Sequence, residues 1–593
     1  MAALYIQVFV RVIEHGEFTY HVSLESVISL FTYRYCKSNI TLYFVKCDYN
    51  ALDLSFEIKL LNLKFNWLNM DSLPQITKSC TLPVITISSN FVISGLCSVS
   101  RQIIMLSQQF NYQENTIKLL GFRNACLISP NETSMWTKFC EIDIEHALKL
   151  IITKHHTEET FLIPVDIARF ENHLGQPVRI HNVYKLAHNL IKKKKKLSES
   201  SSTKDSLKCA SDMPNDSLIR TSEYFPVKYI YAEGMDLTLS DIILFPCFYI
   251  CFKYLNQNEF SEKIPLITKW YKQISTERCE VFLNTIDFLD IKQNFFEYKN
   301  IITPHVEGYS LYKSNPKHYK CRTKNYTRQN DIDNVLQLLT KISLEFKNSL
   351  DQLILTKAVN WNSLPFDALP EGGNLPEKRQ IRKRQQLENL TRVVIQLANP
   401  GDHIVDFCSG SGHLGIIIAF LLPQCQIYLL ENKEESINRA KLRVSKLGLK
   451  NVSFLQCNLD FFRGSFEIGV SLHACGVATD LVMRHCIKRK AKFVCCPCCY
   501  GKVQICHHLS YPRSQIFQKL LQLQEYLVLG HGADQTHDIN NIKTAQGEIC
   551  MNFIDTDRLL YAKEHGYDVV LQKLDPPTCT PKNNLLVGVF SKL

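Results

Sequence analysis

The chain has 593 residues, of which 45% are hydrophobic, 21% charged and 10% aromatic. Because a domain usually has about 100–200 residues, this length suggests roughly three or four domains. The composition excludes collagen, a coiled coil and wholesale disorder. The 68 basic residues exceed the 57 acidic residues by 11, a modest surplus that points only weakly to an acidic partner.

The chain contains 23 cysteines, yet it is far longer than a small secreted scaffold held by disulfides. Its first 18 residues show no basic region followed by a small-residue cleavage site, so we expect no signal peptide. The longest uncharged apolar run, residues 242–252, is too short to span a bilayer and contains Pro246, which indicates a buried core helix. We therefore expect a cytoplasmic protein with reduced thiols that makes no membrane contact, and most of its thiols should be small buried groups.

The first 105 residues predict a mixed α/β domain. Strand-like segments at 5–13, 41–47 and 81–89 alternate with a helical pattern at 23–36. Residues 106–298 predict a helical domain with an insert at about 191–222. The insert is rich in Ser, Asp and Asn and contains Lys192–Lys196, which is either a nuclear signal, a nucleic-acid contact or a solvated loop.

Residues 299–375 predict a linker with a helical lead-in, and the pattern changes in the last domain, residues 376–593. Short apolar strands there alternate with helices, which is typical of a doubly wound, Rossmann-like parallel sheet. The predicted strands are residues 403–408, 426–431, 452–457, 467–472, 492–496, 567–572 and 585–590.

A glycine-rich turn follows the first of these strands. Gly410, Gly412 and Gly415 form G-x-G-x-x-G between a strand and an apolar helix. Glycine suits a tight turn, lets a ligand lie against bare backbone and allows close packing of helix and strand. Glu431 ends the second strand, where a carboxylate accepts hydrogen bonds from both hydroxyls of a ribose; the alternative for Glu431 is a surface helix cap.

The acidic residue before this turn separates methyltransferases from dinucleotide enzymes. Asp406 precedes the glycines as D-x-x-x-G-x-G, which resembles motif I of the Rossmann-like S-adenosylmethionine-dependent methyltransferases, except that Cys408 replaces the first glycine. The resemblance implies that Asp406 helps to hold the methionine end of the cofactor and that Gly410 and Gly412 pass under it. It also implies that Asn458 or Asp460, after the third strand, meets the adenine, although a locally hydrogen-bonded turn would equally explain both residues.

The fourth strand carries the segment Ser471–Asp480 at its carboxyl end, where doubly wound folds place their chemistry. We take Ser471 as a cofactor-binding candidate. His473 is a candidate to assist proton removal from an acceptor, or else a satisfied structural histidine. Asp480 is a second, weaker catalytic candidate.

After the fifth strand come two overlapping C-x-x-C pairs within Cys495–Cys499, followed by Cys506-His507-His508. Four residues here, Cys495, Cys498, Cys506 and His508, match the ligand set of one tetrahedral zinc ion. The other interpretations are packed thiols, which we favour over zinc, or a pocket wall shaped by Pro497 and Tyr500.

Two segments narrow the resemblance. Leu472–Asp480, L-H-A-C-G-x-A-T-D, resembles the methyltransferase family that includes an acceptor-stem tRNA 2′-O-methyltransferase. Pro497–Gly501, P-C-C-Y-G, is similar to the family of glutathione S-transferase C-terminal domain-containing proteins. This second resemblance implies a thioredoxin-like first domain, with a cis-proline turn at Leu82-Pro83-Val84, and a helical glutathione-transferase-like second domain that begins a helix with a capping box, Thr238–Asp241.

Glutathione transfer itself is not expected of the front half. Residues Ile93–Leu96 lack the acidic or amide partner that would hold a γ-glutamyl group. Tyr20 and Ser23 are the available thiol activators, but hydroxyls near a helix start commonly act as caps. We therefore expect this half to dock a protein partner, because a fold does not carry its chemistry with it.

Five cations lie within Lys378–Arg384, directly before the last domain. They either grip the phosphates of an RNA or form a solvated helix face. We expect an S-adenosylmethionine-dependent methyltransferase whose acceptor is RNA. The alternatives are a protein methyltransferase, a glutathione-dependent transferase and a non-catalytic scaffold.

Overall fold

The computed structural model describes the residues of the following ranges: 2–12, 17–48, 54–60, 63–110, 114–153, 160–176, 178, 228–255, 257–277, 279–291, 300–306, 311, 327–340, 358–373, 375–504, 509–536 and 541–591. The predicted insert at 191–222, with Lys192–Lys196, lies outside them. The chain divides into two compact units. The first is Met1–Leu73, Leu82–Ile85 and Gly95–Cys321, and the second is Pro74–Thr81, Thr86–Ser94 and Arg322–Leu593. Within the described ranges, no helix is both long and apolar enough to cross a bilayer.

The first unit begins with a sheet and a helix, as the sequence predicts. Strand β1 (Ala3–Val12) pairs in parallel with β3 (Thr41–Asp48) and antiparallel with β2 (Phe18–Val22). Helix α1 (Leu24–Tyr35) connects β2 to β3, and Ser23 caps it by accepting a hydrogen bond of 3.3 Å from the Ser26 N–H. The short strands β4 (Phe56–Ile58) and β5 (Asn66–Asn69) extend the sheet beside β2 and β3. The Leu82–Pro83 peptide is cis, as the resemblance implied.

Helices make up most of the rest of the first unit. They are α3 (Leu96–Phe110), α4 (Glu114–Lys118), α5 (Met135–Lys138), α6 (Ile144–Thr153), α7 (Val165–Gly175), α10 (Leu239–Tyr254), α11 (Gln257–Lys263), α12 (Pro265–Glu277) and α13 (Cys279–Ile286). The apolar run that contains Pro246 forms α10, which is almost wholly buried. Phe245 on α10 lies 5.7 Å from Phe31 and 4.8 Å from Phe282, measured between ring centroids, so aromatic packing joins α1, α10 and α13.

The predicted capping interaction at the start of α10 is confirmed. Asp241 accepts hydrogen bonds from the backbone N–H of Thr238 at 2.9 Å and of Ala232 at 2.8 Å. It also accepts one from Trp270 Nε1 at 2.9 Å. Burial raises the pKa of this carboxyl to about 6, and three donors offset the cost of placing it in the core.

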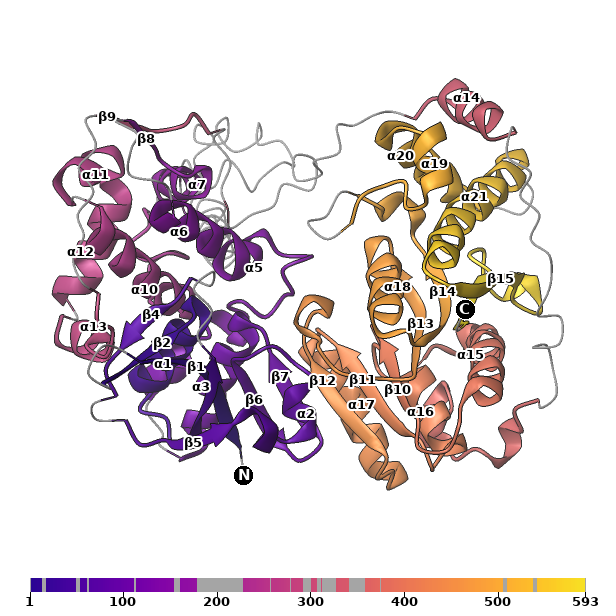
Figure 1. Ribbon diagram of the computed structural model, residues 1–593, viewed down its shortest axis with the longest axis horizontal. Coiled ribbons are helices and arrows are strands. Elements are labelled where there is room, and N and C mark those ends of the chain that lie inside the picture. Colours follow the sequence, from indigo (N-terminus) through magenta and orange to yellow (C-terminus); the bar gives the residue numbers. More distant parts are fainter. Residues whose placement is uncertain are drawn as a thin grey trace, which may run out of the picture. The chain divides into compact units, whose positions relative to one another are not determined.

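All seven strands predicted in the last domain form in the second unit, and β10 to β15 are labelled in Figure 1. They are β10 (His403–Phe407), β11 (Gln426–Glu431), β12 (Val452–Gln456), β13 (Ile468–Cys475), β14 (Lys492–Cys498), β15 (Tyr567–Lys573) and β16 (Asn584–Phe590). The spatial order is β15-β16-β14-β13-β10-β11-β12. The segment β7 (Phe91–Ser94) also belongs to this unit and pairs in parallel with β12.

The prediction of an all-parallel sheet is wrong at one end. The pairs within β12-β11-β10-β13-β14 are parallel, but β16 is antiparallel to β14 and β15 is antiparallel to β16. Only residues 574–583 connect β15 to β16, too few for the crossover of a dozen or more residues that parallel neighbours require. The sheet is therefore mixed.

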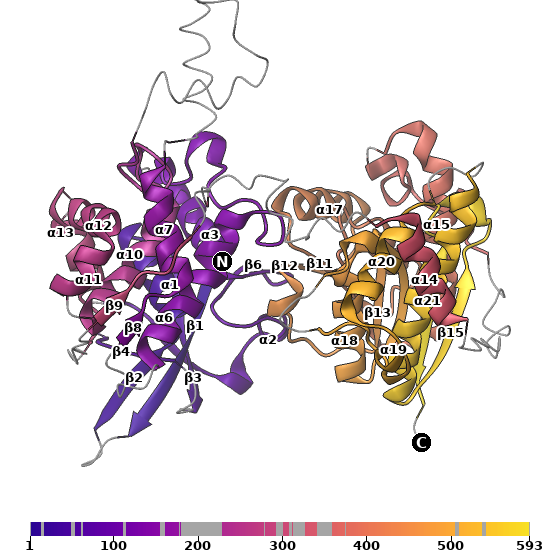
Figure 2. The same ribbon diagram turned by 90° about the horizontal axis from the view of Figure 1, so that it is seen from above.

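Helices cover both faces of this sheet. Helix α17 (Glu434–Leu447) lies on one face and α18 (Val477–Arg489) on the other, as Figure 2 shows. Helices α15 (Glu377–Leu397) and α16 (His413–Leu421) share an apolar core with α17 and the central strands. The remaining helices are α14 (Gln329–Leu339), α19 (Gln515–Leu520), α20 (Leu523–Ala533) and α21 (Ile542–Glu564).

The Pro- and Gly-rich segment 358–373, expected as part of a linker, belongs to this fold. Val359, Leu364 and Ala368 are buried in the core beside α15, α16 and α17. Helix α14, also expected before the last domain, packs with α20 and α21 in a second core of the same unit. The fold of the second unit therefore begins earlier in the chain than the pattern of strands indicates.

Candidate functional site

The glycine turn leads from β10 into α16 and leaves room above its backbone. Gly410 and Gly412 have φ of +56° and +75°, a left-handed conformation that glycine adopts without strain. A Cβ built on Gly410 would meet no atom within 4 Å, so its backbone borders open space. At Gly415 the same test places a Cβ 2.2 Å from Leu429 Cδ2 and 3.1 Å from Asp406 Oδ2, so any side chain there would displace Leu429 and crowd Asp406.

Glu431 holds the glycine turn to the end of β11. Its Oε2 accepts a hydrogen bond of 2.8 Å from the Gly410 N–H, and its Oε1 accepts one of 2.9 Å from the Lys433 N–H. The residue is only 7% exposed, and each carboxylate oxygen keeps a further lone pair. Glu431 is thus a buried acceptor at the turn and not a surface helix cap.

The end of β12 lies beside this position. Asn458 follows β12 and accepts a hydrogen bond of 2.9 Å from Asn432 Nδ2, which joins the ends of β11 and β12. Asp460 lies in the next turn, where its backbone carbonyl accepts from Arg463. Asn458 is buried and Asp460 half-buried, so Asn458 is the more firmly positioned of the two adenine candidates.

Asp406 on β10 is buried, and the charges of Lys383 and Glu431 act on it. Its Oδ2 accepts a hydrogen bond of 2.9 Å from the Gly415 N–H. Burial raises the pKa of this carboxyl to about 7, while the Gly415 N–H and the ammonium of Lys383 act in the opposite direction. Lys383 reaches this group from α15, and burial lowers its own pKa to about 8. A buried carboxyl with a raised pKa therefore lies against the start of α16, within the electrostatic reach of an amine with a lowered pKa.

The segment 358–373 is fastened to the glycine turn by one buried arginine. Arg443 on α17 donates hydrogen bonds to the carbonyl oxygens of Asp367 at 2.9 Å and Leu369 at 3.1 Å. It also donates to the carbonyl of Ser411 in the turn at 3.0 Å. One side chain thus fixes two chain segments beside the site.

His473 lies near the end of β13 in an unusual conformation. Its φ is +68°, and its Nε2 lies 2.9 Å from Oε1 of Gln386 on α15. The Gln386 amide donates at 2.9 Å to the carbonyl of Cys579, so its oxygen faces the histidine and Nε2 carries the proton. Burial, followed by the charge of Lys383, lowers the pKa of His473 to about 4. The imidazole is therefore neutral at pH 7, with Nδ1 as its acceptor.

Three non-glycine residues adopt left-handed backbone at the carboxyl ends of neighbouring strands. They are Cys408 after β10 (φ +55°), His473 in β13 (φ +68°) and Cys499 after β14 (φ +51°). Such conformations cost about 1–3 kcal/mol each and cluster at functional sites. Their gathering at one edge of the sheet supports a site there.

The cysteines of the C-C-P-C-C segment separate into two groups. Cys495 and Cys496 on β14 are fully buried, and burial raises the pKa of Cys495 to about 12. Cys498 and Cys499 instead lie beside Cys475 of β13, with Sγ–Sγ distances of 3.1 Å and 3.5 Å from Cys475. The hydrogen bond from Cys498, more than any other cause, lowers the pKa of Cys475 to about 6.

The thiols that lie close together are therefore not the zinc ligands that the sequence suggested. Cys495 is outside the group formed by Cys475, Cys498 and Cys499, because successive strand residues point to opposite faces. Cys506 and His508 lie outside the described residues.

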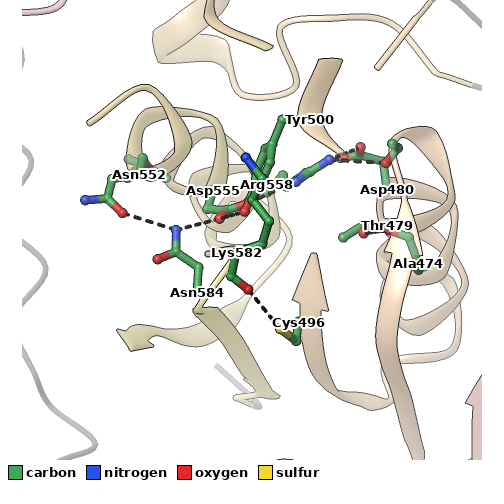
Figure 3. A network of polar contacts seen from close by, with 12 residues as sticks. Ala474, Thr479, Asp480, Cys496, Tyr500, Asn552, Asp555, Arg558, Lys582 and Asn584 are labelled. Carbon is green, nitrogen blue, oxygen red and sulfur yellow. Dashed lines mark hydrogen bonds and ion pairs between the residues drawn. The ribbon is translucent and has the colours of Figure 1, made fainter. Parts of the chain in front are cut away.

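Asp480 is held in a buried ion-pair network, shown in Figure 3. Arg558 on α21 donates to Asp480 Oδ1 at 3.0 Å and to Oδ2 at 2.8 Å. It also pairs with Asp555 at 2.9 Å, and the Arg558 and Asp480 side chains are each 1% exposed. Tyr511 donates a further hydrogen bond of 2.9 Å to Asp480. With both oxygens bound in this way, Asp480 anchors α18 to α21, which corrects the expectation of a catalytic role.

The same network holds the loop after β14. Tyr500 donates a hydrogen bond of 2.6 Å to Asp555, and Asn584 of β16 donates one of 2.7 Å to the same oxygen (Figure 3). Asp534 accepts from the Gly501 N–H at 2.9 Å. Tyr500 is fully buried, so its side chain packs inside the fold and holds the loop in place. It does not line an exposed pocket wall.

The structure gathers most of the predicted site residues at one edge of the sheet. Asp406, Gly410, Gly412, Glu431, Asn458 and His473 lie near or just after the carboxyl ends of β10, β11, β12 and β13, whereas Ser471 lies in the middle of β13. Ser471 is fully buried beside Cys495, whose pKa its hydroxyl lowers slightly against the larger effect of burial.

The sequence assigns Lys383 only to the run of five cations at Lys378–Arg384 and gives Gln386 no role. Both lie on α15 one turn before Leu387 and Leu390, which are buried. Residues four positions apart lie on the same face of a helix, so Lys383 shares a face with Leu387, and Gln386 with Leu390. Continuing the apolar pattern by one turn toward the start of α15 would therefore have predicted that both side chains lie on its buried face.

Comparison with known proteins identifies the chain. It is 39% identical to the glutathione S-transferase C-terminal domain-containing protein homolog of Drosophila melanogaster, over 100% of both chains. It is 35% identical to the human glutathione S-transferase C-terminal domain-containing protein, over 95% of both. The chain belongs to the family of glutathione S-transferase C-terminal domain-containing proteins. The resemblance drawn from P-C-C-Y-G is thereby confirmed.

Within this family member, residues 382–506 match a methyltransferase domain. This range includes Asp406, the glycine turn, Glu431 and His473. Ribosomal RNA small subunit methyltransferase G of Vibrio campbellii is 28% identical over 22% of this chain and 53% of that protein. The second unit therefore contains a methyltransferase domain.

Solved structures give a weaker likeness. An rRNA methylase from Streptococcus thermophilus covers 37% of this chain and 100% of its own, with 11% identity and a TM-score of 0.21. Magnesium protoporphyrin IX methyltransferase from Synechocystis covers 40% of this chain and 92% of its own, with 12% identity and a TM-score of 0.22. At these TM-scores the likeness supports no further conclusion.

Replacing Arg558 with Leu should strongly destabilise the second unit. The carboxylates of Asp480 and Asp555 would stay buried without their partner, a loss that costs about 3–5 kcal/mol. Hydrogen exchange of the α18 and α21 amides in the full chain measures this as faster opening. The control is Arg439→Leu, which removes an exposed pair with Glu435 and should change stability by less than about 1 kcal/mol. Equal effects of the two substitutions would contradict the anchoring role of Arg558.

Proposed function

We propose that the second unit is an S-adenosylmethionine-dependent methyltransferase and that its acceptor is RNA. The observation that carries the proposal is the junction of Glu431 with Gly410, which sets a buried carboxylate beside bare backbone at the edge of a sheet in a matched methyltransferase domain. Parallel sheets bind nucleotide-like ligands at this edge.

The residues of this edge fit the cofactor. The open space over Gly410 admits a ligand against the backbone, and Glu431 keeps lone pairs for the two ribose hydroxyls. We assign the contact with the base to Asn458, whose side chain is held by Asn432. The hydroxyl of Ser409, in the turn itself, is buried without a described hydrogen bond and is a further group for the ligand to satisfy. When bound, the cofactor supplies a methyl group that its sulfonium already activates.

Asp406 suits the charged amino-acid end of the cofactor. Burial keeps this carboxyl half-protonated near neutral pH in the free protein, since its pKa is about 7. A cationic group nearby favours the ionised form. We infer that binding of the cofactor releases a proton from Asp406.

His473 is the candidate for proton removal from the acceptor. Its neutral imidazole donates from Nε2 to Gln386, which leaves Nδ1 to accept a proton. Gln386 holds the ring orientation through its second hydrogen bond to Cys579. The remaining task of the protein is to align the acceptor with the methyl group.

The RNA acceptor is supported by the exposed start of α15. Lys378, Arg379 and Arg382 are exposed there, whereas Arg384 pairs with Glu371 and Lys383 faces Asp406. The sequence run of five cations thus divides into three exposed ones and two engaged in the fold. Three cations on one helix suit the phosphates of an RNA strand that approaches this unit. The first unit has a different proposed role. Ser23, one of the two candidate thiol activators, serves as the cap of α1, which argues against glutathione chemistry. We therefore propose that the first unit docks a protein partner.

Replacing Glu431 with Ala should weaken binding of S-adenosylhomocysteine about 10–100-fold, because charge-assisted hydrogen bonds contribute about 1.5–3 kcal/mol. Titration calorimetry on the full chain measures the effect. Glu435→Ala, an exposed carboxylate on the first turn of α17, is the matched control and should bind normally. Unchanged binding in Glu431→Ala would remove the ribose assignment. Binding of glutathione alone would favour the glutathione-dependent alternative, and binding of neither ligand a scaffold.

Cofactor affinity should rise as the pH increases from 6 to 8. The folded pKa of Asp406 is raised to about 7, so the ionised form that favours a cation is gained as the pH passes through that value. The expected gain is about tenfold, measured by titration at each pH. Asp406→Asn should flatten the profile. A wild-type affinity that falls over this range would contradict the role of Asp406.

Replacing Lys378, Arg379 and Arg382 together with Ala should weaken RNA binding at low salt. Three fewer phosphate contacts should lower the slope of log affinity against log salt by about 2–3. Fluorescence anisotropy with a labelled tRNA measures both quantities. The control replaces the exposed Lys450, Lys488 and Lys490, which removes the same charge elsewhere on the unit. Equal losses of RNA affinity in the two variants would mean that only the net charge of the protein matters, not the position of the cations on α15. If the wild type bound no RNA, a protein acceptor would be favoured.

A further inference from the structure

Three thiols converge at the ends of two neighbouring strands. Cys475 ends β13 and Cys498 ends β14, and the two residues are paired in register. Cys499 follows directly. Their sulfur atoms all lie within 4.8 Å of one another. We call these three residues the thiol cluster.

The backbone is distorted at both strands in a way that produces this convergence. Successive residues of an extended strand point to opposite faces, so Cys498 and Cys499 would ordinarily diverge. The left-handed conformation of Cys499, with φ of +51°, turns its side chain toward Cys475 as well. On β13 the register shifts between Leu472 and Cys475, where His473 has φ of +68°. The thiol cluster thus depends on two residues with strained backbone, His473 and Cys499. This indicates that the three thiols do not meet merely because two strands end side by side.

The sulfur spacing is slightly shorter than the edges of a metal coordination tetrahedron. Zinc–sulfur bonds of about 2.3 Å in tetrahedral geometry place neighbouring sulfurs about 3.8 Å apart. Cys475 Sγ lies 3.1 Å from Cys498 Sγ and 3.5 Å from Cys499 Sγ. These distances are well beyond the 2.05 Å of a disulfide, and the two sulfur pairs would have to widen by about 0.7 Å and about 0.3 Å to admit the ion.

Charge and exposure define what kind of site this is. Three thiolates and one Zn²⁺ carry a net charge of −1, and the ammonium groups of Lys433 and Lys502 act on Cys475 from nearby. Cys475 is exposed, whereas Cys498 and Cys499 are half-buried. The fourth position of a tetrahedral ion would therefore face solvent, which is the arrangement of zinc sites that bind water or substrate.

We propose that Cys475, Cys498 and Cys499 bind one zinc ion through three thiolates, with the fourth position open at the carboxyl edge of the sheet. This set replaces the one drawn from the sequence and contains only Cys498 from it. Thiolate ligands select zinc over hard cations such as Mg²⁺. The proposal does not depend on methyl transfer, because metal content is measured without activity.

The test is metal analysis of the full-length protein purified under reducing conditions with zinc supplied. The wild type should retain one zinc per chain. The triple variant Cys475→Ser, Cys498→Ser, Cys499→Ser should retain none, and Cys47→Ser, a half-buried cysteine of the first unit, should bind as the wild type does. Substitution with Co²⁺ gives a second measurement. The sulfur-to-cobalt charge-transfer absorption should fall by about one third in Cys475→Ser, which removes one of three thiolate ligands.

Several results would overturn the proposal. Zinc retained in full by the triple variant would place the metal elsewhere, and copper bound in place of zinc would exclude the zinc assignment. A disulfide between Cys475 and Cys498, found by mass spectrometry in the freshly isolated protein, would assign the thiol cluster to redox chemistry. Since Cys475 is exposed, Cys475→Ser should fold normally, so an unchanged cobalt spectrum in that variant would also contradict the proposal.

Discussion

The parallel pairing of β11 with β10, of β10 with β13 and of β13 with β14 is the constraint on which the candidate site depends. It brings the carboxyl ends of these strands to one edge of the sheet, where the backbone must leave the extended conformation to enter the helices. Gly410 and Gly412 turn in the left-handed region after β10, and His473 and Cys499 do so on β13 and after β14. Each turn exposes backbone or redirects a side chain. The parallel strand order therefore brings the glycine turn, His473 and the thiol cluster to the same edge of the sheet.

A second interaction fixes the loops at this edge from below. The Arg558 guanidinium joins Asp480 on α18 to Asp555 on α21, and Tyr500 and Asn584 bind the second oxygen of Asp555. A buried charge cluster of this kind is a weak source of stability, since desolvation offsets most of its Coulomb attraction. Its geometry is specific, however, and it holds the start of α18 and the loop after β14 in one arrangement.

Local pattern predicted much of this unit. All seven strands, the glycine turn and the acidic residues at the ends of β10 and β11 follow from short apolar runs and the spacing of Gly and Asp or Glu. The strand ends meet because of topology, which alternating strands and helices already indicate. The antiparallel β15 and β16 were missed because direction depends on the length of a connection and not on the strand itself.

The remaining features depend on contacts between distant parts of the chain. Asp480 looks catalytic from its place after β13, but Arg558, 78 residues further on, occupies both its oxygens. Lys383 looks like one cation of an RNA patch, and only the packing of α15 turns it toward Asp406. Cys475 and Cys499 join Cys498 through strand register and a left-handed residue, which no spacing rule along the chain reveals.

Hydrogen exchange of the full chain with and without S-adenosylhomocysteine tests the central claim most directly, because it maps the bound ligand onto the backbone. The account predicts slower exchange at residues 406–415, 429–433 and 456–460, with the peptides of α10 and α12 unchanged. Protection confined to the first unit, or no protection at saturating ligand, would contradict the account.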